Sequence, residues 1–114
     1  MITGTSLIAG KEVGLAYCYA TEIAFTKYTG VSIHQLDAEN PEHILYVIIS
    51  AIVAYCQANG TEIGVKDEDI IYGANPKEIT NALKVIYALR NEWYEIPAEE
   101  ITSEEKEESQ EKKD

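Results

Sequence analysis

The chain has 114 residues, two cysteines and a formal net charge of -11, which bounds it to one small acidic domain. Such a charge repels phosphate backbones and anionic lipid surfaces, so we expect no nucleic acid and no membrane among its partners. The first residues lack the basic and apolar regions of a signal peptide, so we expect a cytoplasmic protein. Cys18 and Cys56 then read as reduced, buried thiols, with a disulfide in a secreted protein as the alternative.

Residues 1–98 are expected to form a single globular domain, and residues 99–114 an acidic disordered tail. From Glu99 onward eight acids face three lysines, which gives the tail a charge of -5. After Ile101 no apolar side chain remains to be buried. This stretch therefore cannot offset the entropy cost of becoming ordered.

The N-terminal part predicts a β-hairpin, with two β-rich runs separated by the residues 10–12. In the second run, Val13, Leu15, Tyr17 and Tyr19 would share one face because side chains alternate along a strand. The opposite face would carry the small residues Gly14, Ala16 and Cys18. Such a face favours close packing against something bulky.

A short helix is expected next, with Thr21 or a neighbour as its N-cap and with Tyr28 near its end. Gly30 suits the left-handed position that commonly follows a helix. Residues 31–36 read as a linker or an abbreviated turn that is anchored by apolar side chains.

The central helix is predicted from Pro41 to Ala58. Asn40 can accept hydrogen bonds from free amides of its first turn, and Pro41 suits its first position. The block from Ile44 to Cys56 is apolar on almost every face, so the rest of the chain must wrap it. The block is shorter than the roughly 20 residues that cross a bilayer, which makes this helix the most buried element of a soluble core.

Two further helices are expected in the second half of the chain. Residues 67–73 predict a short one that begins with three acids, which favour the positive end of a helix dipole. A longer helix begins after Asn75, where Glu78 completes a capping box. Its apolar stripe should lie along the central helix and consists of Ile79, Leu83, Ile86 and Trp93. The predicted fold class is a mainly α domain around a central apolar helix with a short N-terminal β-hairpin, with α+β as the alternative.

No motif in the sequence indicates a catalytic activity. His34 and His43 lack the spacing of metal ligands, and the acids at 67–69 lack the alternation and the glycine of a calcium loop. No nucleophile stands in a Gly-flanked elbow, and no glycine-rich phosphate loop is present. We therefore expect no catalytic residue, no metal and no cofactor, and the protein is predicted not to be an enzyme.

The aromatic residues instead favour a protein interface. Eight tyrosines stand against one phenylalanine and one tryptophan, and tyrosine suits half-buried and interfacial positions. The predicted protein-binding residues lie near the end of the last helix and are Tyr87, Trp93, Tyr94 and Ile96. The hairpin is a second candidate through its open edge, with Tyr17 and Tyr19. The alternative is a small domain whose tyrosines are simply half-buried everywhere.

The order of these parts resembles that of the tail assembly chaperones of long-tailed bacteriophages and prophages. The resemblance spans residues 10 to 98. It is carried by residues 11–17, by residues 22–30 with the following Ile33 and Leu36, by the apolar helix 44–56, and by Trp93-Tyr94-Glu95-Ile96-Pro97.

The resemblance implies a small, mainly helical, non-enzymatic protein that coats the tape-measure protein and recruits tail-tube subunits in the host cytoplasm. A programmed frameshift often extends such proteins at the C-terminus, and the charged tail fits that design. No binding residue is carried over from the family. Self-association is a further expectation. The alternative function is a small cytosolic adaptor or regulatory module unrelated to phage, and the gene neighbourhood would distinguish the two.

Overall fold

The computed structural model describes residues 1–95. Its elements in chain order are β1 (Ile2–Ile8), β2 (Lys11–Tyr17), α1 (Tyr19–Thr29), the 3-10 turn η1 (Ile33–Gln35), α2 (Pro41–Asn59), α3 (Asp67–Gly73) and α4 (Pro76–Trp93). The predicted fold class, mainly helical with an N-terminal hairpin, is confirmed. The predictions for Ile96, for the domain end at residue 98 and for the tail 99–114 lie outside the described residues.

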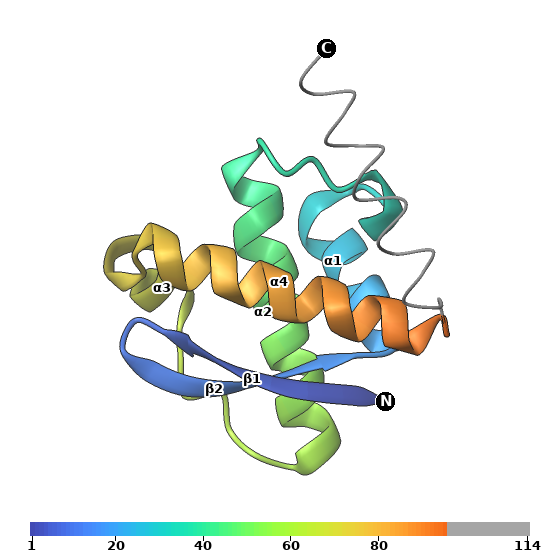
Figure 1. Cartoon of the computed structure of the whole chain (residues 1–114), viewed down its shortest axis with the longest axis horizontal. Coiled ribbons are helices and arrows are strands. Elements are labelled where there is room, and N and C mark those ends of the chain that lie inside the picture. Colours follow the sequence, from blue (N-terminus) through green and yellow to red (C-terminus); the bar gives the residue numbers. More distant parts are fainter. Residues whose placement is uncertain (96–114) are drawn as a thin grey trace.

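The helix α2 runs through the middle of the domain, with α1 beside it and the hairpin and α4 across it (Figure 1). The prediction that the last helix lies along the central one is wrong, because α4 crosses α2 and packs mainly on β1. The approach of α4 to β1 is close at Gly4, since a Cβ there would lie 3.1 Å from Cγ1 of Val85 and that side chain would have to shift slightly. A glycine at this position thus suits the close approach of α4 to the strand.

The hairpin pairs β1 and β2 antiparallel, from Ile2 opposite Tyr17 to Ile8 opposite Lys11. Its turn is Ala9-Gly10, one residue earlier than predicted. Both residues take positive φ angles, 53° and 77°, as the tight primed turns that match the strand twist require. The carboxylate of Glu78, at the start of α4, accepts hydrogen bonds from the backbone nitrogens of both residues, at 3.1 and 3.0 Å. Glu78 therefore fastens the hairpin turn to α4.

Two predictions at the end of β2 need correction. Tyr19 does not share the strand face, because the chain turns into α1 at this residue. Thr21 is not the N-cap; Cys18 holds that position, and Thr21 lies one turn inside. The hydroxyl of Thr21 accepts from the backbone nitrogen of Cys18 at 3.3 Å and donates to the carbonyl oxygen of Ala16 at 2.9 Å. The buried threonine thus holds the helix start against the strand.

Both faces of β2 are covered, since Leu15, Ala16 and Tyr17 are fully buried. The predicted close packing against the small-residue face is confirmed at Gly14, where any Cβ would overlap the ring of Tyr55 from α2. Both cysteines are free thiols; Cys56 is buried and Cys18 is half-buried.

The cap at the start of α2 is the one that the sequence predicts, and the helix ends one residue later than predicted, at Asn59. The side chain of Asn40 accepts from the backbone nitrogens of Glu42 and His43 at 2.9 and 3.4 Å, and Gly60 takes the left-handed conformation after Asn59. The helix contributes eight buried residues, although a larger share of the shorter β2 is buried. It is thus the largest contributor to the core rather than the element buried most completely.

The length argument against a membrane span does not hold for α2. The residues that flank the apolar block extend it to a helix of 19 residues, of which an 18-residue window has a mean hydropathy of 1.3. Within residues 1–95 this helix is long and apolar enough to cross a bilayer by length and composition. Of that window 44% is buried by the domain, and its other large apolar side chains are half-buried and pack against the core.

Candidate functional site

One of the predicted aromatic residues, Tyr94 directly after α4, meets a carboxylate from α1. One oxygen of Glu22, Oε2, accepts a hydrogen bond from the hydroxyl of Tyr17 at 2.8 Å and another from the hydroxyl of Tyr94. Nε2 of His34 lies 3.6 Å from the same oxygen and 3.4 Å from the Tyr94 hydroxyl. These four residues, here the Glu22 cluster, join β2, α1, η1 and the end of α4.

Electrostatics keep the two hydroxyls of the cluster as donors. Burial, together with the hydrogen bond to Glu22, raises the pKa of Tyr17 far above its ordinary range. The hydrogen bond to Glu22 also raises the pKa of Tyr94. The hydrogen bonds of Glu22 with these two hydroxyls connect α1 to β2 and to the end of α4, so we interpret the Glu22 cluster as a structural contact between elements.

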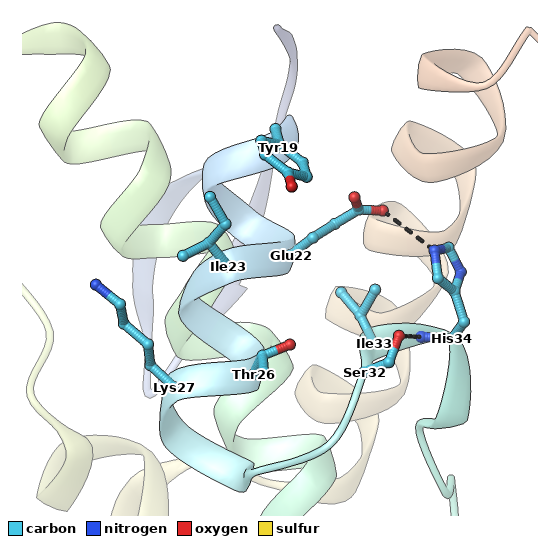
Figure 2. Close-up of a pocket in the computed structure, with 8 residues that line it drawn as sticks. All are labelled: Tyr19, Glu22, Ile23, Thr26, Lys27, Ser32, Ile33 and His34. Atoms are coloured by element: carbon cyan, nitrogen blue, oxygen red, sulfur yellow. Dashed lines mark hydrogen bonds and ion pairs between the residues drawn. The ribbon is translucent and has the colours of Figure 1, made fainter.

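A shallow pocket of about 440 Å³ lies beside the cluster, between α1 and η1 (Figure 2). It is lined by Tyr19, Glu22, Ile23, Thr26, Lys27, Ser32, Ile33 and His34. Glu22 points across it toward His34, whereas Lys27 points to the other side of α1. The Ser32 hydroxyl accepts from the backbone nitrogen of His34 at 3.2 Å, as the cap of η1. Three of the polar residues that line this pocket, Glu22, Ser32 and His34, thus make contacts within the domain.

The structure places the predicted protein-binding residues in different environments. Tyr17 is fully buried, which corrects its assignment as a surface anchor; its ring lies 6.4 Å from that of Tyr94. Tyr94 itself is 42% exposed and Tyr87 is 37% exposed. Trp93 is half-buried and packs against the core, and Tyr19 is exposed at the start of α1. Ile96 lies outside the described residues.

A second surface, which sequence reasoning missed, is an apolar groove of about 420 Å³ at the other end of α4. We call it the α2–α3–α4 groove; it is lined by Pro41, Glu42, Ile44, Leu45, Ile70, Ile71, Ala74 and Ile79. Ile71 is 55% exposed and the next residue of α3, Tyr72, is 87% exposed. The signal that could have found it is the adjacent pair Ile70-Ile71 in the short helix α3, because two neighbouring side chains of a surface helix point in different directions and only Ile70 is buried.

Within residues 1–95, no group of three or more histidine, cysteine, aspartate or glutamate side chains gathers where it could hold a metal ion. The two histidines lie apart: the ring of His43 packs edge-on against Phe25, and its Nδ1 accepts from the backbone nitrogen of Asp37 at 3.0 Å. Both imidazoles thus have structural contacts.

Comparison of the chain with protein-family models, with curated proteins and with solved structures gave no match.

Proposed function

We propose that this protein is a non-enzymatic tail assembly chaperone of a phage or prophage, which binds the tape-measure protein in the host cytoplasm and aids assembly of the tail tube. The observation that supports the proposal best is the α2–α3–α4 groove, an apolar surface left open on a small acidic domain. Open apolar surface of this kind marks an interaction site. The sequence resemblance supplies the kind of partner.

The proposed work is reversible shielding of apolar helical surface on a long partner until tube subunits displace the chaperone. This task needs modest affinity per copy and several copies per partner, because many weak contacts along one chain add up to a stable coat. An acidic surface keeps the unbound copies soluble. No covalent chemistry is required.

The proposal predicts a tape-measure gene beside this gene, and the experiment is co-expression with the protein that such a gene encodes. We expect the partner to become soluble in the presence of this protein. If the partner is equally soluble alone, the chaperone function is wrong and the adaptor function takes its place.

The substitutions used in this experiment need to leave the packing of the core unchanged. Replacing Trp93 or Tyr94 would disturb packing or the Glu22 cluster, so a lost effect would not separate binding from folding. Ile71→Gln is better, because Ile71 is 55% exposed. Its matched control is Ile63→Gln, at a residue that is 47% exposed and is not among those lining the groove. We expect the first substitution to reduce solubilisation and the second to leave it unchanged.

A further inference from the structure

We infer that the α2–α3–α4 groove binds an amphipathic helix whose apolar stripe is flanked by lysine or arginine residues. The inference rests on the protein-binding part of the proposed function and adds the chemistry of the segment that the groove accepts. It does not depend on the identity of the protein that carries the segment.

The floor of the groove is apolar and held in place by the core. Ile70 is buried, and Ile44, Leu45 and Ile79 are half-buried and pack against the core cluster. Ile71 projects from the α3 side with more than half of its surface exposed. A fixed apolar trough between helices is the usual receptor for the apolar face of a partner helix, whose anchors recur every three or four residues.

Acidic side chains outnumber basic ones around the groove. Glu42 is the one charged residue among those that line it. The two segments that supply the lining, residues 39–45 and 66–79, carry six carboxylates and two lysines. Glu78 and Asp69 are engaged by backbone nitrogens, and the other four carboxylates and both lysines are exposed to solvent. Charge complementarity therefore favours a helix with positive residues beside its apolar stripe.

The same charges disfavour two other occupants. Residues 99–114 of this chain carry eight acids, so the excess of acidic side chains around the groove repels them. An anionic lipid surface is repelled in the same way. A basic helix combines the apolar stripe that the floor needs with a charge opposite to that around the groove.

The test uses the full chain and two synthetic 18-residue peptides. Both carry leucines along one helical stripe; one has lysines at its two ends and the other has glutamates there. We expect the lysine peptide to bind at least about tenfold more tightly by calorimetry. Ile71→Gln should weaken that binding about tenfold, and Ile63→Gln should leave it unchanged. Equal binding of the two peptides, or binding that Ile71→Gln does not weaken, would overturn the inference.

Charge reversal separates the groove from the overall acidity of the protein. The double substitution Glu42→Lys/Glu68→Lys should weaken lysine-peptide binding about fivefold. Glu12→Lys, at an exposed position on β2, should change it little. An equal effect of both variants would overturn the assignment to this groove. A second outcome would also overturn the inference. If the protein binds phosphatidylcholine vesicles and Ile71→Gln abolishes this binding, the occupant of the groove is a membrane.

The outcomes also separate this inference from the proposed function. If co-expression makes the tape-measure protein soluble but the lysine peptide does not bind, the inference is wrong and the chaperone function stands. If the lysine peptide binds as described but co-expression has no effect, the groove assignment stands and the tape-measure protein is not the partner.

Discussion

At the scale of single residues, the contact between Gly14 and Tyr55 fixes how closely β2 approaches α2. Because a Cβ at Gly14 would overlap the tyrosine ring, Gly14→Ala forces the strand or the ring to move. We expect the free energy of unfolding to fall by about 1–3 kcal/mol, the usual cost of overpacking. Urea denaturation measures it. Gly64→Ala is the control, since a Cβ there meets no atom within 4 Å, and equal losses for the two variants would contradict the packing described.

At the scale of elements, the joint between the hairpin and α4 depends on the ionised form of Glu78. Hydrogen bonds from the backbone nitrogens of Gly10, Asn75 and Ala9 lower the pKa of this carboxyl. A lowered folded-state pKa means that Glu78 stabilises the fold above its unfolded pKa, and that this contribution is lost as the pH falls through the folded value. We therefore expect Glu78→Gln to flatten the acid side of the stability curve.

Thermal unfolding between pH 3 and pH 7 measures this effect. The control is Glu92→Gln, at an exposed position near the far end of α4. An acid profile that Glu78→Gln leaves unchanged would mean that the hairpin turn is held by other contacts.

The helix α2 contributes more buried residues to the core than the other described elements. Substitutions of its buried side chains therefore give the clearest test of the fold. Ile48 is fully buried and Ile52 is 3% exposed. Replacing either with alanine should cost about 2–5 kcal/mol, from lost burial and from the cavity left behind. Ile63→Ala, at an exposed position, should change stability by less than about 0.5 kcal/mol. A loss below about 1 kcal/mol at both buried sites would rule out the central position of α2.

Local signals explain which elements could be predicted. Asn40-Pro41 and Asn75-Pro76 are caps that act within one turn, so the starts of α2 and α4 follow from the sequence. The predicted start of α1 is wrong, because Thr21 acts from the third helical position, where its hydroxyl accepts from the backbone nitrogen of the N-cap Cys18 and donates to the carbonyl oxygen of Ala16. The crossing of α4 over α2 depends on the approach to Gly4, a partner more than 70 residues away in the chain.

For the candidate sites too, local features could be predicted from the sequence and tertiary contacts could not. That Tyr94 lies at an exposed helix end was predictable, but its bond to Glu22 and the burial of Tyr17 are tertiary contacts. The groove could not be predicted from the sequence for a different reason. Ile44 and Leu45 of α2 are plainly apolar in the sequence, yet that they stay half-buried and line a groove depends on where α3 and α4 pack.

At the scale of the whole molecule, the open apolar groove favours self-association, whereas the net charge of -11 opposes it. At low salt the acidic side chains of two copies repel, and we expect a monomer. In 1 M NaCl the Debye length falls to about 3 Å, which screens the repulsion and leaves the apolar attraction. Sedimentation equilibrium should then detect dimers. Ile71→Gln should suppress them and Ile63→Gln should not; association that is independent of salt would place the self-contact on another face.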